Sequence, residues 1–443
     1  MGIINQVAVL LQSSLGPNLD AIGRETGVIQ RQRKFSGASL LKMLVLTVMK
    51  TPRPTTDDFV ATAALLGVNV TPEAVEKRFT EKRVAHLRAS LEQVVKSVVA
   101  AAPVAGSLLD KFTAVVIGDS TTVTLPDDFE AEFPGCGGKT GSGKAAVKIQ
   151  VAWELRRGQL EKLDVHPGRD SDAKSVAVDE PVVPGSLTLR DLGYFCLKRF
   201  RSLGAQGAFW ISRWQHGTAV FDAEGRRWEM GAFLQGQPAG MPVDVSIALG
   251  AEDRLDCRLI ALRVPPEVAN RRRQAAFEKA PKHGRVPTQE SLDLCDWTIF
   301  VTNCLATFLT WKEVVVLYRT RWQIELLFKL WKSHNHLAAS RAHWTSMERL
   351  ALFWAKLIGV VLQHWLLLTS NAADPRRSPW KAARVIRNWM ESLTRALDNI
   401  DELIRTLRDM AMTIASVAQK KRQKKRPSLF QLLSDPELLE WNS

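Results

Sequence analysis

The chain has 443 residues, of which 46% are hydrophobic, so it can bury a sizeable core and is long enough for several domains. Its 60 lysines and arginines exceed its 46 aspartates and glutamates. The resulting net charge of +14 favours a polyanionic partner, either nucleic acid or an acidic membrane surface. The five cysteines form no Cys-x2-Cys pair, which argues against a zinc ribbon or a disulfide framework and fits a reducing cytoplasm.

Residues 1–105 carry the pattern of a helical N-terminal domain. Thr71-Pro72-Glu73 predicts a helix start, because a threonine N-cap precedes a proline at the first helical position and an early acid. Apolar residues then recur with a helical period, and basic residues stand between them. The basic face fits a DNA-binding domain, and a plain structural bundle fits it as well. No secretory signal is predicted, because the chain does not open on a basic segment and an apolar block.

Residues 106–215 change to a pattern of strands and helices. The run Thr113–Asp119 is apolar and β-branched and predicts a strand that ends in a carboxylate. Two alternating segments, residues 146–153 and 160–166, predict a hairpin across an Arg-Arg-Gly turn. Residues 172–180 then predict a short helix.

A second carboxylate follows the next predicted strand. Leu187 and Leu189 lead into Asp191, after which we expect a helix as far as Ser202 and an apolar strand at residues 207–212. Strand, hairpin, helix, strand, helix and strand together predict a fold of the α/β class.

Residues 216–296 interrupt this order. They hold further strand-like segments, among them Val243–Leu249 and Cys257–Val264, and a basic segment that begins at Arg271. We therefore predict a β-rich insertion here. Residues 297–345 then resume the core with its last strand and a long helix.

Residues 346–443 have the pattern of a helical C-terminal region suited to dimerisation, in which residues 382–417 form a long periodic stretch. The most membrane-like stretch, Leu350–Thr369, is interrupted by three polar side chains, so a buried helix is predicted instead of a membrane span. The basic run Lys420–Arg426 is typical of a solvated linker, with contact to DNA or a partner as the alternative.

The long helix expected within residues 297–345 carries four candidate functional side chains: Tyr318, Arg321, Glu325 and Lys332. At about 100° per residue of α-helix they lie within an arc of about 60°. One helix face therefore presents a phenol, a guanidinium, a carboxylate and an ammonium. A solvated face whose arginine and glutamate form an i,i+4 pair is the plainer interpretation of the same charges.

The spacing Tyr-x2-Arg-x3-Glu-x6-Lys resembles the motif of the insertion-sequence transposases of the DDE type, in the IS-four branch. The contexts of Asp119 and Asp191 resemble the family's two other acidic blocks, in the family's order. The resemblance implies an RNase H-like core of mixed sheet and helices with a β-rich insertion. It also implies a helical N-terminal domain that recognises DNA ends.

By this resemblance Asp119, Asp191 and Glu325 are the catalytic residues and the metal ligands. We expect Mg2+, with Mn2+ as a substitute, because hard cations take carboxylate oxygens and a metal pair stabilises both the attacking and the leaving oxygen of a phosphodiester. Four other acids occur near these positions but in turn-like or pre-strand settings that suit ordinary loop solvation: Asp110, Asp164, Asp170 and Asp172. Zinc is not expected, because His334 and His336 are two residues apart and do not share a helix face.

The resemblance also implies contacts with DNA. Tyr318, Arg321 and Lys332 would hold phosphates near the cut, a task that suits the arginine fork and the lysine charge. Trp297 and Trp322 match positions where this branch carries tryptophan, and an aromatic ring there could stack an extruded base. Core packing is the alternative for each tryptophan, since the chain has 14 of them.

The function predicted from the resemblance is an enzyme that cuts DNA at terminal inverted repeats and joins the 3′ hydroxyl ends to target DNA. It would act as a homodimer in a synaptic complex, in the bacterial cytoplasm at the nucleoid and without a membrane partner. Two alternatives remain open from the residues alone. One is an RNase H-like nuclease that cuts structured DNA but never joins it, and the other is a domesticated DNA-binding protein without catalysis.

Overall fold

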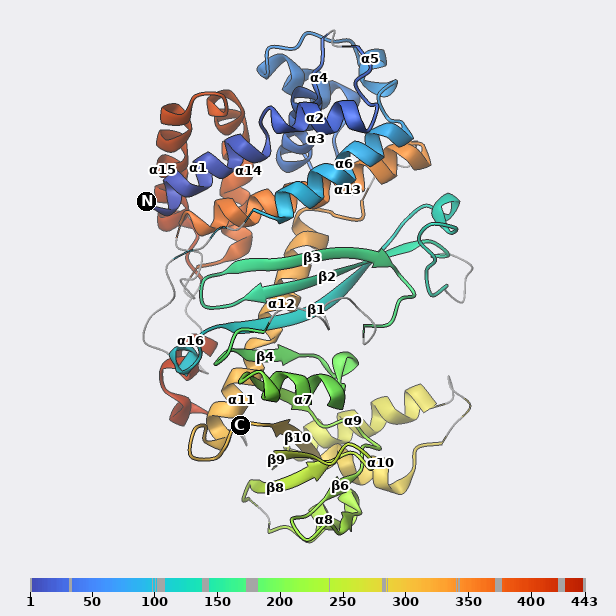
Figure 1. The fold of residues 1–443 in the computed structure, drawn as a ribbon, viewed down its shortest axis with the longest axis vertical. Helices are drawn as coiled ribbons and strands as arrows, with labels where there is room; N and C mark the ends of the chain where they lie inside the picture. The colour runs from blue at the N-terminus through green and yellow to red at the C-terminus, as the bar shows by residue number, and fades with distance from the viewer. Residues whose placement is uncertain are drawn as a thin grey trace. The chain divides into compact units, whose positions relative to one another are not determined.

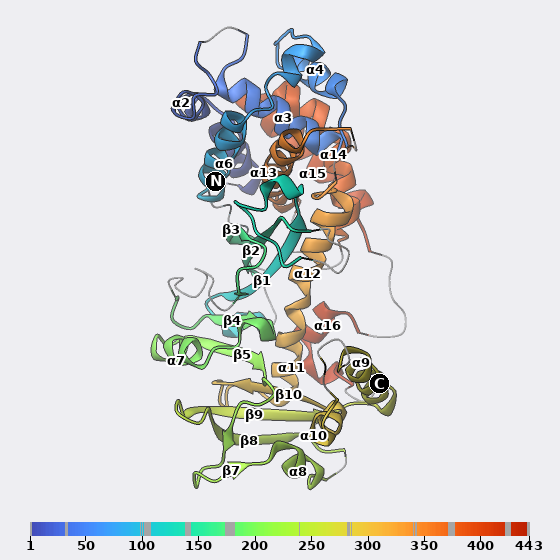
Figure 2. The ribbon, with the colours of Figure 1, turned by 90° about the vertical axis from the view of Figure 1, so that its right-hand side faces the viewer.

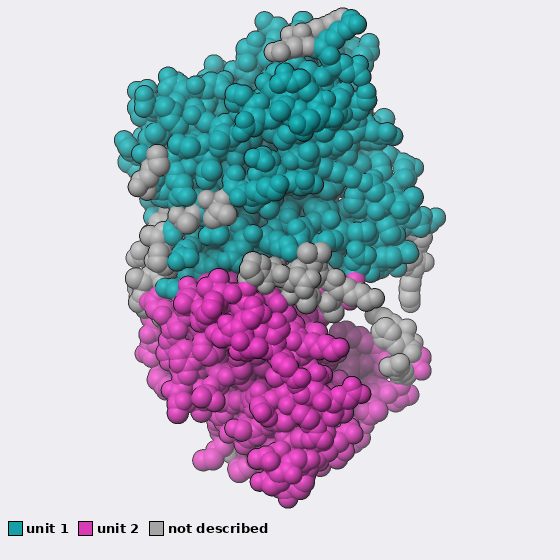
Figure 3. Space-filling model, viewed as in Figure 1, with its two compact units in different colours: residues 1–104, 120–170, 324–422 teal, residues 105–119, 171–323, 423–443 magenta. Residues whose placement is uncertain are grey.

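The computed structural model describes residues 2–31, 34–97, 99, 101, 108–137, 143–172, 182–238, 240–280, 284, 286–339, 341, 343–370, 377–420 and 427–440. These residues form a mixed α/β fold, which confirms the predicted class. The chain divides into two compact units. Unit 1 comprises residues 1–104, 120–170 and 324–422, and unit 2 comprises residues 105–119, 171–323 and 423–443 (Figure 3). The five-part division expected from the sequence stays a prediction.

Unit 1 is mainly helical. Its main helices are α1 (Ile3–Ser14), α2 (Asn18–Glu25), α3 (Gly37–Lys50), α4 (Thr56–Leu65), α5 (Pro72–Glu76), α6 (Glu81–Val95), α13 (Ser346–Leu368), α14 (Pro379–Ala396) and α15 (Ile400–Val417). Ser36, Thr55 and Thr345 begin three of them with capping boxes, in which the N-cap and N3 side chains each accept from the other's backbone N–H. These bonds satisfy amide groups that the start of a helix leaves without partners.

Two predicted helical stretches are divided by capping residues. The predicted start at Thr71 is confirmed, because its side chain accepts from the Ala74 N–H, but α5 ends at Glu76 and Thr80 caps a new helix. Residues 382–417 are likewise split between α14 and α15, since the Asn399 side chain accepts from the first amides of α15. A side chain that bonds to nearby backbone favours a new start over continuation of the helix.

Helix α13 is, among the described residues, long and apolar enough to cross a membrane, yet its apolar window is wholly buried inside the structure. Its three polar interruptions have partners. Lys356 donates to the carbonyl of His336, Gln363 accepts from Asn335 at 2.5 Å, and His364 bonds to the carbonyl of Gly158. The predicted buried helix is therefore confirmed.

Unit 1 also contains the predicted hairpin. β2 (Ala146–Glu154) and β3 (Gln159–Pro167) pair antiparallel, and Gly158 in the turn adopts φ +66°, which favours glycine (Figure 1). β2 is also next to β1 (Val115–Thr124), whose last five residues belong to this unit. β1 thus runs beyond Asp119, where the sequence predicted its end, because the β-branched residues Thr121–Thr124 continue the strand beside β2.

Unit 2 is built on a mixed sheet. Its strands follow the order β1, β4 (Leu187–Arg190), β5 (Phe209–Arg213), β10 (Trp297–Thr302), β9 (Leu255–Arg263), β8 (Val243–Leu249), β6 (Val220–Phe221) and β7 (Arg227–Trp228). β1, β4 and β5 are parallel, whereas the pairs from β5 to β7 are antiparallel. The strands predicted near Asp191, at residues 207–212 and at β8 and β9 are confirmed.

Helices cover this sheet on both faces. α7 (Leu197–Ala205) and α11 (Trp311–Thr320) lie on opposite sides of the parallel strands (Figure 2). Phe200 of α7 stacks on Trp210 at 4.2 Å, whereas Tyr318 of α11 meets Phe300 edge-on at 5.2 Å. Four shorter or peripheral helices complete the unit: α8 (Met230–Gln235), α9 (Pro266–Lys279), α10 (Gln289–Asp293) and α16 (Leu429–Ser434).

The stretch at residues 216–296 mixes strands with helices α8, α9 and α10, and the predicted basic segment at Arg271 forms part of α9. Its strands β8 and β9 extend the sheet that contains β10. The helix predicted at residues 172–180 lies outside the described residues from position 173 onward, and so do residues 421–426 of the basic run.

One buried arginine ties the sheet to the segment that precedes α11. Arg258 of β9 is 6% exposed and donates to both carboxylate oxygens of Asp244 on β8. It also donates to the carbonyls of Cys304 and Leu309. These bonds fix the chain just before the helix that carries Tyr318.

We expect Arg258→Met to lower the free energy of unfolding of unit 2 by about 3–5 kcal/mol, because it leaves a carboxylate and two carbonyls without their donor. Urea unfolding followed by tryptophan fluorescence would measure this loss. Arg227→Met, at an exposed position on β7, is the matched control and should change the midpoint little. Equal midpoints for the two variants would contradict the role given to Arg258.

Candidate active site

Two aspartates lie side by side where the parallel pairing of β1 with β4 ends. β1 and β4 pair with Gly118 opposite Arg190, so the next residues along the two chains are Asp119 and Asp191. Neighbouring strands are about 4.8 Å apart, and residues in equivalent register point to the same face of a sheet. The register therefore brings together two carboxylates that are distant in the sequence.

A single guanidinium lies between these carboxylates. Arg321 Nη1 donates to Asp119 Oδ2 at 3.3 Å, and Arg321 Nη2 is 3.8 Å from Asp191 Oδ1. The Asp119 and Arg321 side chains are 17% and 13% exposed, whereas that of Asp191 is 50% exposed. Because partial burial reduces solvent screening, the pair with Asp119 is the stronger of the two. The arginine predicted to hold DNA phosphates is thus directed at the two carboxylates here.

A second arginine, Arg213, occupies the same row of the sheet and was not predicted from the sequence. β4 and β5 pair with Leu189 opposite Ile211, so Arg213 is the register neighbour of Asp191. Burial lowers the pKa of Arg213, while the charge of Asp191 acts to raise it. The row Asp119, Asp191, Arg213 therefore places a second positive charge beside the two acids.

Tyr318 is a half-buried neighbour of this row. Its hydroxyl donates to the carbonyl of Arg190 at 3.4 Å, and its ring contacts Phe300. Burial raises its pKa, so the phenol stays protonated and serves as a hydrogen-bond donor. In this arrangement Tyr318 holds the end of β4, immediately before Asp191.

The helix that carries the four predicted residues is not one regular α-helix. α11 ends just before Arg321, which forms a turn, and α12 (Trp322–Lys329) continues into a π-helical turn at Leu330–His334. The 100° spacing behind the single-face prediction therefore does not hold as far as Lys332, because a π turn has more residues per turn than an α-helix. Lys332 is exposed within this π turn.

The remaining predicted site residues differ in exposure. Glu325 is half-buried on α12, in which the chain passes from unit 2 into unit 1. Trp322 is 49% exposed, as a base-stacking residue requires. Trp297 is 4% exposed within the core of unit 2, so its ring packs there and would have to leave the core to meet a base. This burial favours the packing alternative, and the DNA contact of Trp297 stays a prediction.

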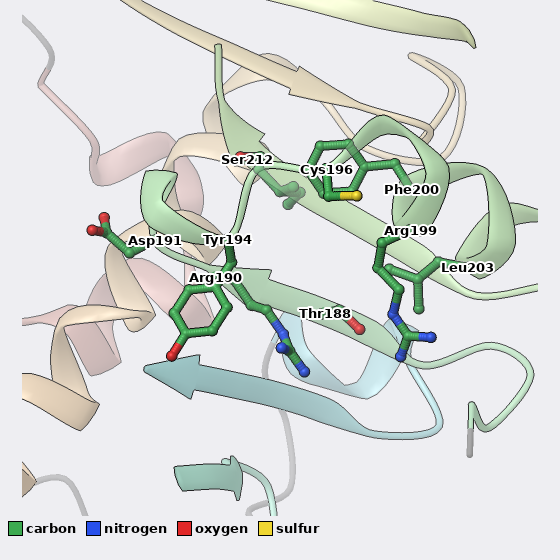
Figure 4. Close-up of a pocket in the computed structure, with 10 residues that line it drawn as sticks. Thr188, Arg190, Asp191, Tyr194, Cys196, Arg199, Phe200, Leu203 and Ser212 are labelled. Carbon is green, nitrogen blue, oxygen red and sulfur yellow. The ribbon is translucent and has the colours of Figure 1, made fainter. Parts of the chain in front are cut away.

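A small pocket lies between β4, β5 and α7 (Figure 4). Arg190 lies along one side, with its guanidinium 5.4 Å from the Tyr194 ring. Gly118 leaves room for it, because a Cβ there would come within 3.0 Å of Arg190 Nε. Figure 4 shows the Asp191 carboxylate pointing away from Arg199 at the far end of the pocket. The carboxylate therefore acts outside the pocket, on the side of Arg321.

The two aspartates suit a hard cation. Both carboxylates already lie within reach of one positive group, and carboxylate oxygens are the ligands that Mg2+ and Mn2+ prefer. Within the described ranges, no group of three or more histidine, cysteine, aspartate or glutamate side chains is arranged to hold a metal. Unit 2 by itself thus supplies two carboxylates as possible metal ligands, with Arg321 between them.

The sequence contains a pattern that points to Arg213, but the acidic motif alone does not include this residue. Three parallel strands carry the same pattern, in which a buried aliphatic residue is followed two positions later by a charged one: Ile117 and Asp119, Leu189 and Asp191, Ile211 and Arg213. Sites in sheets of this kind gather at the carboxyl ends of parallel strands. Comparing the strand ends, instead of searching for acids alone, would have found the third position.

Comparison with known proteins agrees with this geometry. Residues 110–362, more than half of the chain, match the family described as Transposase DDE domain. The chain belongs to this transposase family. It is 26% identical to the transposase for insertion sequence element IS231F of Bacillus thuringiensis subsp. israelensis, over 96% of this chain and 94% of the relative. It is 25% identical to those of IS231B from subsp. berliner and IS231E from subsp. finitimus, with 94% and 98% of this chain covered and 92% and 95% of the relatives.

The DDE transposase is therefore an enzyme of the nuclease and strand-transferase class that acts on DNA, as the sequence predicted. The match includes the segments that bear Asp119, Asp191 and Arg321. Enzymes of this family generally use divalent metal ions, which agrees with the oxygen donors of the two aspartates.

We expect Arg321→Met to bind Mn2+ about ten-fold more tightly in the absence of DNA. The substitution removes a charge-assisted contact of about 1.5 kcal/mol that competes for the same carboxylates, and 1.4 kcal/mol is a factor of ten. Titration followed by electron paramagnetic resonance of free Mn2+ measures this directly. Arg319→Met, at an exposed position two residues earlier, is the control. Equal Mn2+ affinities for the wild type and Arg321→Met would exclude such competition.

Proposed function

We propose that this DDE transposase belongs to the IS-four branch and that Asp119, Asp191 and Glu325 form its catalytic centre. The observation that carries the proposal is the pair of carboxylates on one cation, Asp119 and Asp191 on Arg321. Glu325 follows Arg321 by four residues on the chain and supplies the third carboxylate. The spacing of Tyr318, Arg321, Glu325 and Lys332 supports the assignment to the branch.

An RNase H-like core is proposed for the parallel strands and the hairpin. The order β3, β2, β1 occurs in unit 1 and the order β1, β4, β5 in unit 2, with β1 contributing to both. The antiparallel hairpin, the parallel strands and a helix after the last strand agree with the order of elements in such a core. In this proposal residues 216–296 are an insertion and residues 1–105 bind DNA ends.

Mg2+, or Mn2+ in its place, is the proposed cofactor, held by Asp119, Asp191 and Glu325. When bound, it would supply activation of a water or a 3′ hydroxyl and stabilisation of the leaving oxygen. Asp119, as the more buried aspartate, offers the fixed ligand. Asp191, half-exposed, offers the ligand open to DNA.

Arg321 has two successive partners in this proposal. Without DNA its guanidinium neutralises the aspartates, and with the metal and DNA in place its fork would turn to a backbone phosphate. Tyr318 keeps the β4 end in position, while Lys332 and Trp322, both exposed, suit contact with phosphate and base.

The proposed partners are the terminal inverted repeats of a mobile element and the target DNA, bound by a homodimer in a synaptic complex in the bacterial cytoplasm at the nucleoid. The net charge of +14 supports association with DNA. The names of the insertion-sequence relatives support the same assignment.

We expect Asp119→Asn, Asp191→Asn and Glu325→Gln each to lower the rate of DNA cutting by at least about a thousand-fold with DNA binding nearly unchanged, because the loss of a metal ligand removes electrostatic stabilisation of several kcal/mol. The measurement is nicking in Mg2+ of a plasmid that carries the inverted repeats beside the gene. Binding is measured on the same DNA by gel shift.

Asp164→Asn is the matched control, because Asp164 on β3 pairs with Lys162 and lies outside the proposed centre. It should cut at the wild-type rate. Retained cutting by Glu325→Gln would remove Glu325 from the centre, and retained cutting by either aspartate variant would defeat the proposal.

Joining separates the transposase from a nuclease that only cuts. With precut ends bearing a 3′ hydroxyl, the wild type should link them to a supercoiled target plasmid in Mg2+, and Asp191→Asn should form no such product, because cutting and joining share one centre. Ends that lack the 3′ hydroxyl are the control substrate. Cutting without any joined product would favour the nuclease alternative.

A further inference from the structure

Unit 1 contains a cluster of positive groups that the proposed catalytic centre does not use. Its charged members are Arg53, Lys356, Arg384 and Arg387, and His334 and His336 lie among them. In the described part of the chain, none of the four charged groups forms an ion pair with a carboxylate, and the nearby Glu391 pairs with Lys50 and Arg395 instead. Like charges gathered in this way repel one another unless an anion joins them.

A small open pocket is lined by two cations of this cluster, Lys356 and Arg387. Lys356, Arg387, Asn335 and Gln363 give it a polar side, and residues of α3 and α13 give it an apolar side. α14, which bears Arg384 and Arg387, packs against α3 and against the π-helical turn after α12. The pocket is therefore formed by elements of unit 1 alone.

The turn beside the pocket is held by the same cations. Arg387 Nη2 donates to the carbonyl of His334 at 2.7 Å, and Lys356 Nζ donates to the carbonyl of His336 at 2.9 Å. His336 adopts φ +49°, a conformation uncommon for residues with a side chain and frequent at ligand clamps. The backbone of Arg53 accepts from Arg341, which fixes the loop that bears it.

Two polar atoms of the cluster have unused hydrogen-bonding capacity. Arg387 Nε and His334 Nε2 are buried and have no hydrogen-bond partner among the described residues. Buried polar atoms are nearly always paired, so the Arg387 Nε donor, on a residue that lines the polar side of the pocket, points to a missing acceptor. An acceptor-rich anion would satisfy the guanidinium donor, and a phosphate oxygen has the right charge and geometry.

The pKa shifts that these groups cause in one another agree with an anion site. Burial and then the charges of Arg387 and Arg384 lower the pKa of His334 to about 4. Burial and then Arg53 lower the pKa of Lys356 to about 8. The electrostatic potential around these groups thus disfavours a further positive charge and would stabilise a negative one.

We infer that this cluster, which we name the Arg384–Arg387 pocket, binds a backbone phosphate of duplex DNA. The inference rests on the proposed function only in taking DNA as the source of the phosphate. Arg387 and Lys356 form the floor of the site and hold the turn that follows the helix of Glu325. Arg384 and Arg53 are both exposed, and their charges act on Arg387 and Lys356 respectively. A phosphate bound here fixes the carboxyl end of that helix.

The test compares Arg384→Gln and Arg387→Gln with Arg395→Gln in the full-length protein. Arg395 lies on the same helix, is 60% exposed and pairs with Glu391, so it is the matched control. Binding to a fluorescent duplex oligonucleotide is measured by anisotropy over a series of salt concentrations without divalent metal, so that no DNA is cut. The slope of the logarithm of affinity against the logarithm of salt concentration should be shallower by about 1 for each site variant and unchanged for the control.

Unchanged slopes for both site variants would overturn the inference. Arg384 is exposed, so its variant still gives a result if Arg387→Gln does not fold. Thermal melting in inorganic phosphate separates the sources: stabilisation of the wild type that both variants lose, with unchanged DNA slopes, would assign the pocket to a free anion and exclude the DNA phosphate. Because binding is measured without metal, failure here is distinct from retained cutting by Glu325→Gln, which tests the catalytic proposal.

Discussion

The side-by-side register of β1 and β4 is the constraint on which the site depends. Two carboxylates on adjacent strand ends repel each other in a partly buried setting, so the fold needs a positive group between them. Arg321 provides it from the end of α11, with one nitrogen directed at each aspartate. The sheet sets where the acids stand, and the helix end determines what neutralises them.

This arrangement gives Arg321 a role that the helix motif alone does not reveal. A guanidinium between the aspartates offsets the repulsion between their carboxylates. The same planar fork also suits a phosphate, which is the partner that the helix motif implies for it. Arg213, the register neighbour of Asp191, places a second positive charge beside the acids.

Much of the fold followed from local chemistry in the sequence. The hairpin at β2 and β3, the strand before Asp191, the cap at Thr71 and the buried α13 all depend on nearest neighbours, turn residues and hydrophobic period. The irregular turns at Arg321 and at Leu330–His334 could not be predicted from the sequence, because a helical wheel assumes regular geometry throughout. Arg213 was missed because its significance is its register beside Asp191, which becomes evident only when the strands are compared with one another.

Glu325 occupies the segment in which the chain passes from unit 2 to unit 1. At the start of this segment Arg321 is bonded to the aspartates, and at its end the carbonyls of His334 and His336 accept from Arg387 and Lys356. Cations therefore hold both ends of the segment. The irregular turns at Arg321 and Leu330–His334 interrupt the helix near these two anchors, where a change of hydrogen bonding requires the least rearrangement. The hydrogen bonds of Arg321 at one end, and of the carbonyls of His334 and His336 at the other, thus set the limits of the segment that bears Glu325.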